Sequence, residues 1–191
     1  MRIIAGSAGG RSLESPEDRS IRPTPDRVRE AIFSILGNIR GAVVVDGFAG
    51  TGAMGCEALS RGAEVCYFID HSQEAVGIVE ENLERIDARQ RGIVLHGAFE
   101  HQISMIDEEA HLWFLDPPYQ QNKAKPALEA MVGADCVPDQ ALVVLEQDQD
   151  EEMPEVEGFE LEDTRMYGRA RVAFFRYRGS GVQGSRGPGE A

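Results

Sequence analysis

The chain has 191 residues, 42% of them hydrophobic, with 33 acidic against 19 basic side chains and a net charge of −14. This length suffices for one well-buried domain, and no apolar run approaches the roughly 18 residues of a membrane span. The start lacks the apolar region of a signal peptide, so we expect a cytoplasmic protein. We also expect the protein to be a monomer. The net charge argues against a nucleic-acid partner unless basic residues gather on one face.

Basic residues are concentrated at the two ends of the chain. Residues 1–41 sum to +2 and residues 164–191 to +5, which leaves −21 for the middle. A polyanion could therefore be met only by the two ends, if folding brings them together. On charge alone, the simpler interpretation is that the arginines balance a local acidic surface.

The first 40 residues are expected to form an arm and a helix. Residues 2–5 have the composition of a short strand, and residues 6–21 are rich in turn formers. Thr24 can cap the helix that follows, with Pro25 in its first turn, and Gly37 ends it.

A strand, a glycine-rich turn and a helix are expected between Val43 and Ser60. Three valines have the composition of a strand buried in a parallel sheet, and the run ends in Asp46. The glycines that follow let backbone approach a ligand closely, which is typical of a nucleoside site. A turn that only packs the helix on the strand would explain the glycines, but not a polar Asp46 after three valines.

Two cofactors compete for this turn. Gly50-Thr-Gly-Ala-Met-Gly55 fits the pattern with which dinucleotide-binding folds hold a pyrophosphate. Asp46 would repel a pyrophosphate but could pair with the ammonium group of S-adenosylmethionine. Asp70 ends a second buried strand and could accept ribose hydroxyls, which supports adenosine without choosing between the cofactors.

The alternation of strands and helices continues beyond Asp70. Ser72 caps a helix, and residues 92–96 form a third strand. Phe99 follows in a loop that should line the ligand crevice, where it could belong to the core or flank adenine. We predict no metal site and no disulfide framework, because the histidines lack ligand spacing and the cysteines form no C-x-x-C pair. The cysteines, expected as buried thiols, are Cys56, Cys66 and Cys136.

A fourth strand ends in Asp116-Pro-Pro-Tyr119. Two consecutive prolines remove two backbone donors, so the loop offers carbonyl acceptors. Asp116 and the Pro117 carbonyl could therefore hold an exocyclic amine by its hydrogens, while the ring of Tyr119 could stack on a planar base. A proline-terminated strand with a boundary tyrosine is the purely structural alternative.

The rest of the chain predicts a helix, three strands and a tail. The helix is expected over residues 126–132 and a fifth strand over 141–146, followed by an acidic loop over 147–157. Residues 159–162 and 171–177 should form a closing hairpin through Tyr167-Gly168. The Gly- and Ser-rich tail, 179–191, is expected to be disordered.

These motifs resemble a known family. Asp46-Gly-Phe-Ala-Gly-Thr-Gly52 is similar to the cofactor loop of class I S-adenosylmethionine-dependent methyltransferases, and Asp116-Pro-Pro-Tyr119 to the motif of amino-methylating members. Arg22-Pro-Thr-Pro-Asp-Arg-Val-Arg-Glu30 and Glu57-Ala-Leu-Ser-Arg-Gly-Ala63 resemble 16S rRNA guanine-N2 methyltransferases of the RsmD type. The match covers residues 1 to about 177.

The resemblance implies a Rossmann-like α/β fold: a seven-stranded, mostly parallel sheet with helices on both faces and an antiparallel last strand. It divides the chain into an arm and helix (1–40), a methyltransferase domain (41–178) and a tail (179–191). The implied partner is 16S rRNA, within the 30S subunit or an assembly intermediate. The implied catalytic residues are Asp116, Pro117, Pro118 and Tyr119. The implied cofactor-binding residues are Asp46, Gly47, Phe48, Ala49, Gly50, Thr51, Gly52, Asp70, His71, Ala98 and Phe99.

The chain departs from the family at three of these positions. Members usually have Leu in place of Gly47, many have an acidic or amide side chain near Ala98, and some have Glu in place of Asp70. A dehydrogenase, a non-catalytic RNA-binding domain, and a methyltransferase acting on adenine N6 or a protein glutamine stay open as alternatives.

The arginines of the N-terminal region are the expected RNA contacts. Arg11, Arg22, Arg27 and Arg29 would meet phosphates together with the C-terminal arginines. Arg29 could instead pair with Asp26 on the helix surface. In a further alternative, Arg22 and Thr24 close the arm over the cofactor.

Overall fold

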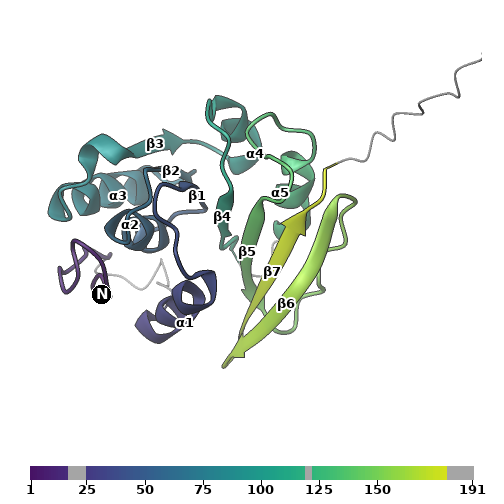
Figure 1. The fold of residues 1–191 in the computed structure, drawn as a ribbon, viewed down its shortest axis with the longest axis horizontal. Coiled ribbons are helices and arrows are strands. Elements are labelled where there is room, and N and C mark those ends of the chain that lie inside the picture. Colours follow the sequence, from purple (N-terminus) through teal and green to yellow (C-terminus); the bar gives the residue numbers. More distant parts are fainter. Residues whose placement is uncertain (17–24, 119–121, 180–191) are drawn as a thin grey trace, which may run out of the picture.

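A computed structural model describes residues 1–16, 25–118 and 122–179. A seven-stranded sheet runs through it in the order β3-β2-β1-β4-β5-β7-β6 (Figure 1). The first five strands pair in parallel, whereas β7 is antiparallel to both β5 and β6. The predicted fold class is therefore confirmed. The strands are β1 (Val43–Gly47), β2 (Val65–Asp70), β3 (Gly92–His96), β4 (Leu112–Leu115), β5 (Leu142–Asp148), β6 (Phe159–Tyr167) and β7 (Ala170–Tyr177).

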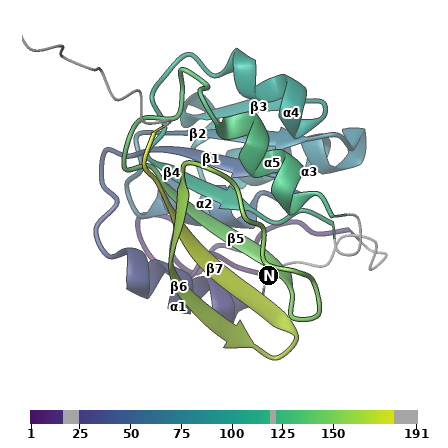
Figure 2. The same cartoon turned by 90° about the vertical axis from the view of Figure 1, so that its right-hand side faces the viewer.

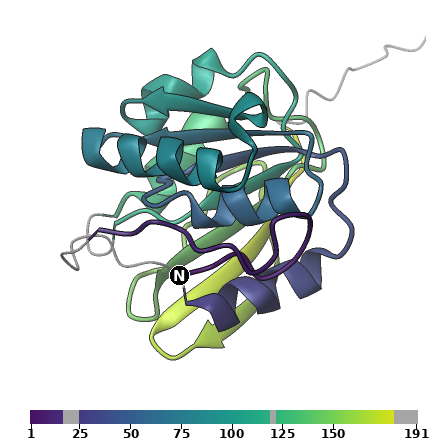
Figure 3. The same cartoon turned by 90° about the vertical axis from the view of Figure 1, so that its left-hand side faces the viewer.

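Helices cover both faces of the sheet. The N-terminal arm and α1, α2 and α3 lie on one face (Figure 3), and α4, α5 and the short helix η2 lie on the other (Figure 2). Another short helix, η1, follows α3. The helices are α1 (Asp26–Leu36), α2 (Ala53–Ser60), α3 (Gln73–Arg85), η1 (Arg89–Arg91), α4 (Phe99–Gln102), η2 (Ile103–Met105) and α5 (Ala124–Met131).

The apolar strands form the core because successive side chains point to opposite faces. In β2, for example, Cys66 and Phe68 pack under α2 and α3, whereas Tyr67 and Ile69 pack on the face of α4. Trp113 of β4 is fully buried and donates its ring N–H to the Ala110 carbonyl. All three cysteines are free and buried, as predicted, and burial raises the pKa of each thiol.

The N-terminal arm is held by side chains of the central helices. The buried carboxylate of Glu57 in α2 accepts the backbone N–H groups of Ile4 and Ala5, at 2.7 and 3.1 Å. Asn82 of α3 accepts the Glu14 N–H and donates to the carbonyls of Glu14 and Thr51. Because Thr51 belongs to the glycine turn, Asn82 links the arm directly to that turn.

The structure corrects several predicted boundaries. Residues 2–5 are not a strand, since only an isolated bridge joins Arg2 to Ser12. The fifth strand extends to Asp148 because it pairs with β7 along that length, and β6 extends to Tyr167 for the same reason. The predicted helix cap Thr24 and the tail from residue 180 lie outside the described residues. No helix in the described part of the chain is long and apolar enough to cross a membrane.

Candidate active site

A cavity of about 510 Å³ lies where β1, β2 and β4 end. Parallel strands end at the same edge of a sheet, and strand order reverses between β1 and its two neighbours, β2 and β4. Ligands of open α/β sheets bind at such a switch point. The cavity is lined by the start of α1 with the residue before it (Pro25, Arg27, Val28), by β1, the turn after it and the start of α2 (Asp46, Phe48–Thr51, Ala53, Met54), by the end of β2, the turn after it and the start of α3 (Asp70–Ser72, Ala75), by the loop after β4 (Asp116–Pro118), by β5 (Glu146) and by the β6–β7 hairpin (Tyr167–Ala170).

The Asp46 carboxylate lies at the base of this cavity. It is 4% exposed, and its Oδ2 accepts the Gly55 N–H at 2.8 Å. Burial raises the pKa of Asp46 to about 7, while the Gly55 N–H opposes this shift and the nearby Asp70 charge adds to it. A cationic ligand group would reverse the shift by pairing with the carboxylate. The site therefore favours a cation at this point.

Asp70 holds two loops in place. Its Oδ2 accepts the Gly50 N–H at 2.8 Å and its Oδ1 accepts the Ser72 N–H at 2.9 Å. Ser72 in turn caps α3 by accepting the Ala75 N–H, as predicted. Each oxygen of an ionised carboxylate has a further lone pair, so Asp70 retains acceptor capacity for hydroxyl groups.

The glycines of the turn have different roles. Gly50 and Gly52 adopt left-handed φ values of 54° and 71°, which favour glycine. A Cβ on Gly55 would lie 2.3 Å from the Phe68 ring, and one on Gly47 would lie 2.7 Å from the Phe99 ring. Close packing therefore explains why glycine stands at positions 47 and 55. For these two glycines, the interpretation that the turn only packs the helix on the strand is sufficient.

Four of the predicted cofactor-binding residues do not line the cavity: Gly47, Gly52, Ala98 and Phe99. Phe99 is 2% exposed and belongs to the core, so the core alternative holds for this residue. Its ring stacks on Phe48, which does line the cavity, with centroids 5.4 Å apart. Ala98 is exposed and precedes α4. His71 lines the cavity with its Nδ1 3.5 Å from Asp70 Oδ1.

The loop after β4 supplies the opposite part of the cavity wall. Asp116, Pro117 and Pro118 all line the cavity, so the structure brings them together with Asp46 and Asp70. Tyr119 lies outside the described residues. The two motifs found in the sequence thus meet at one site.

Among the described residues, Arg11 and Arg29 of the predicted arginine cluster do not join Arg27 at the cavity. Arg29 is fully buried, forms ion pairs with Asp26 at 3.0 Å and Glu57 at 3.8 Å, and donates to the Arg2 carbonyl. Its prediction as an RNA contact is wrong, because its side chain points into the protein. Arg11 is paired with Asp87 at 2.6 Å and does not line the cavity.

Arg27 and the hairpin turn complete the cavity wall. Arg27 is exposed and lines the cavity, whereas Arg22 lies outside the described residues. Glu146 and the turn Tyr167–Ala170 also line it, although the sequence analysis did not predict this. Glu146 had a signal in the sequence, since it is a carboxylate near the end of a buried strand, like Asp46 and Asp70.

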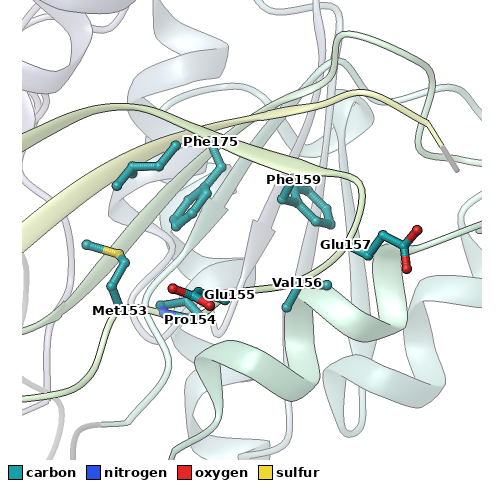
Figure 4. Close-up of a pocket in the computed structure, with 8 residues that line it drawn as sticks. Met153, Pro154, Glu155, Val156, Glu157, Phe159 and Phe175 are labelled. Atoms are coloured by element: carbon teal, nitrogen blue, oxygen red, sulfur yellow. The ribbon is translucent and has the colours of Figure 1, made fainter. Parts of the chain in front are cut away.

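A second cavity, of about 450 Å³, lies between residues 153–157 and strands β6 and β7 (Figure 4). The rings of Phe159 and Phe175 form part of its wall, and the carboxylate of Glu157 points away from them. None of the residues predicted to act in catalysis or binding lines this cavity. We therefore place the candidate active site in the first cavity.

Comparisons with known proteins show the family of this chain. The family described as "Conserved hypothetical protein 95" matches residues 1–176. The chain belongs to this family. Among its relatives, "Putative rRNA methyltransferase YlbH" of Bacillus subtilis is 37% identical over 94% of this chain and 100% of its own length. "Ribosomal RNA small subunit methyltransferase D" of Escherichia coli is 31% identical over 82% of this chain and 79% of its own length.

This member of the family is also similar in fold to solved structures of proteins named as methyltransferases or methylases. "Putative methyltransferase yhhF" from Escherichia coli matches with a TM-score of 0.81 at 27% identity, over 94% of this chain and 98% of that one. A putative methylase from Haemophilus influenzae matches with a TM-score of 0.76 at 26% identity, over 93% and 98%. The fold is that of class I methyltransferases.

Proposed function

We propose that this protein transfers a methyl group from S-adenosylmethionine to the exocyclic N2 of a guanine in small-subunit rRNA. The observation that carries the proposal is the meeting of the Asp46 turn and the Asp116-Pro117-Pro118 loop in one cavity. Relatives named as small-subunit rRNA methyltransferases support the substrate. The cytoplasm remains our prediction for where the enzyme acts.

The residues of the cavity fit S-adenosylmethionine. Asp46 would pair with its ammonium group and Asp70 would accept its ribose hydroxyls, while Phe48 and the backbone of the glycine turn would pack on its adenosine. A pyrophosphate fits less well, because it would bring a second negative charge to the buried Asp46 carboxylate. When bound, S-adenosylmethionine supplies a sulfonium methyl group that an amine can take directly.

Asp116 and the Pro117 carbonyl would prepare the amine. The lone pair of guanine N2 is delocalised into the ring, which makes this nitrogen a poor nucleophile. Two acceptors that hold both of its N–H groups favour a more tetrahedral, more reactive nitrogen and aim its lone pair at the methyl group. The N2–C bond forms as the C–S bond breaks, and the methylated amine then releases a proton to solvent. We therefore assign no general base.

The target base must leave its stack to reach this cavity, at a cost of a few kcal/mol. Stacking on Tyr119 would offset part of this cost. The same pair of acceptors would suit any planar amine, so adenine N6 and a protein glutamine amide are the competing substrates.

The test is labelled methyl transfer to unmodified 30S subunits, naked 16S rRNA and DNA, followed by nucleoside analysis. We expect the label in N2-methylguanosine from small-subunit RNA. Label in N6-methyladenosine or in protein would overturn the proposed substrate. Calorimetric titration with S-adenosylmethionine and with NAD tests the cofactor separately, since binding of NAD alone would indicate a dehydrogenase.

A further inference from the structure

Most arginines in the described ranges are neutralised by carboxylates. Arg169 lines the candidate active site, but it is paired with Asp148 and Asp150 at 2.9 and 2.7 Å. Pairs of this kind leave little charge to attract a polyanion. The paired arginines are Arg2, Arg11, Arg29, Arg61, Arg85, Arg89, Arg165, Arg169, Arg176 and Arg178.

Three exposed cations near the candidate active site have no such partner among the described residues. One is Arg27, which lines the cavity from α1. The others are Lys123 and Lys125, which are the two lysines of the whole chain. An acidic protein thus places both of its lysines in the segment that follows Asp116.

Local structure places these lysines close to the active site. Lys123 is the residue before α5, and Lys125 lies in the first turn of that helix. Lys123 lies five positions after Pro118, which lines the cavity, so their Cα atoms are at most about 18 Å apart. A single-stranded RNA whose base enters the cavity would have its neighbouring phosphates within reach of these side chains.

The lysines do not complement the dipole of their helix. The N-terminus of a helix carries a partial positive charge, which favours acidic side chains there and disfavours cations. The first turn of α5 holds no acidic residue. Lys123, Lys125 and the helix terminus therefore create a local positive potential, and ionic screening over about 10 Å at 0.1 M salt separates it from distant acidic residues.

We propose that Lys123 and Lys125 bind the phosphates that flank the target nucleotide, while Arg27 contacts the RNA backbone from α1. This inference rests on the proposed function and moves the RNA contact from Arg11 and Arg29 to the start of α5, the helix that follows Asp116 in the chain. It also explains how a protein of net charge −14 meets a polyanion. A few unpaired cations at the active site provide the attraction, and ion pairs neutralise most of the others.

The test compares Lys123→Gln and Lys125→Gln with a matched control, Arg40→Gln. Arg40 is also exposed, and no ion pair joins it to a described residue. It precedes β1 and so lies toward the amino ends of the parallel strands, opposite the candidate active site. Each substitution removes one positive charge, so the three variants share the same net charge.

Binding of naked 16S rRNA is measured against salt concentration for each variant. The slope of log K against log salt should become shallower by about 0.7–0.9 for each lysine removed and stay at the wild-type value for Arg40→Gln. Affinity for S-adenosylmethionine and the thermal midpoint of unfolding should be unchanged in all three variants. An unchanged slope in the lysine variants would overturn the inference, as would an equal change in Arg40→Gln, which would indicate a general effect of net charge.

Methyl transfer by the wild-type protein separates this inference from the proposed function. If the wild type methylates small-subunit RNA but the lysine variants keep its salt slope, only the phosphate contacts are wrong. If the wild type transfers no methyl group to any RNA, the proposed function itself fails.

Discussion

The two halves of the active site are built in different ways. The proposed cofactor half comes from residues 46–75, in which Asp46 accepts the Gly55 N–H of α2, and Asp70 accepts the N–H groups of Gly50 and Ser72. The substrate half is assembled from α1, the loop after β4, β5 and the β6–β7 hairpin turn, which are far apart in the sequence. The geometry of the first half depends on segments that are neighbours in the sequence, whereas that of the second half depends on the topology of the sheet.

This difference predicts that binding and catalysis can be separated by mutation. The cofactor half fixes its own geometry through hydrogen bonds between neighbouring segments. Changes in the loop after β4 leave those bonds intact. Variants of the two halves should therefore affect different measurements.

Asp116→Ala should produce the largest effect. Removing the carboxylate that holds the amine should lower kcat/KM for RNA methylation by about 10²–10³-fold, a loss typical of a missing polar partner of the reacting group. Affinity for S-adenosylmethionine, measured by calorimetry, should change by less than about twofold, since Asp116 is assigned to the substrate half. Asp116→Asn is the matched control, because it keeps one acceptor oxygen and should retain part of the activity. Equal losses of activity and cofactor affinity in Asp116→Ala would contradict the separation of the two halves.

Asp46→Asn should weaken S-adenosylmethionine binding by about 10- to 150-fold, the loss expected when a charge-assisted interaction of about 1.5–3 kcal/mol disappears. The amide oxygen can still accept the Gly55 N–H, so the turn should keep its shape. Asp70→Asn makes the same chemical change beside neutral hydroxyls and should cost less. If Asp70→Asn proves the more damaging, the ammonium group does not lie at Asp46.

The pH dependence of cofactor binding should report the same carboxylate. The pKa of Asp46 is raised to about 7 in the folded protein, so the free protein holds a proton there below that pH. Pairing with the ammonium group lowers this pKa, so binding should release a proton near pH 6, and affinity should rise with pH before levelling off above about pH 7. Calorimetry in buffers of different ionisation enthalpy measures the released proton. Asp46→Asn should abolish the release, and an unchanged release in this variant would assign the proton to another group.

Stability of the cofactor-free protein should show the opposite trend. A folded-state pKa above the unfolded value near 3.8 means that the Asp46 contribution is fully present below about pH 4 and is lost as pH rises through about 7. Asp46→Asn should therefore lose less stability over this pH range than the wild type. Denaturant unfolding at pH 5 and pH 8 gives both values.

The sequence predicted the strand, turn and helix around Asp46 correctly because their signals are local. A run of valines, a carboxylate and closely spaced glycines specify a strand, a turn and a helix within a short stretch, and β2 with Asp70 repeats the pattern. The alternation of strands and helices along the chain likewise predicted the mostly parallel sheet. Phe99 stayed ambiguous because an aromatic residue in a site loop suits either the core or a ligand, and only its packing against Phe48 and Trp113 decides between them.

The substrate half was harder to predict because its residues meet only in three dimensions. The sequence predicts a basic cluster that includes Arg29, but helix periodicity turns this side chain inward, toward Asp26 and the buried Glu57. Glu146 and the hairpin turn reach the cavity only because β5 and β7 continue the sheet beyond β4. No local sequence pattern predicts that these residues line the same cavity, because it is the order of the strands in the sheet that brings them together.

The smallest effect is expected for Tyr119→Phe. If Tyr119 binds the flipped base by stacking, the ring is needed and the hydroxyl is not, so kcat/KM for RNA should stay within about threefold of the wild type. Tyr119→Ala removes the ring and should lower kcat/KM by about 5- to 150-fold, the equivalent of 1–3 kcal/mol of stacking, mainly through KM. Neither change should alter S-adenosylmethionine affinity, because the cofactor half is held by its own hydrogen bonds. Steady-state kinetics on small-subunit RNA give both values. If Tyr119→Phe loses as much as Tyr119→Ala, the hydroxyl acts on the substrate, and recognition in this half depends on a hydrogen bond instead of an aromatic surface.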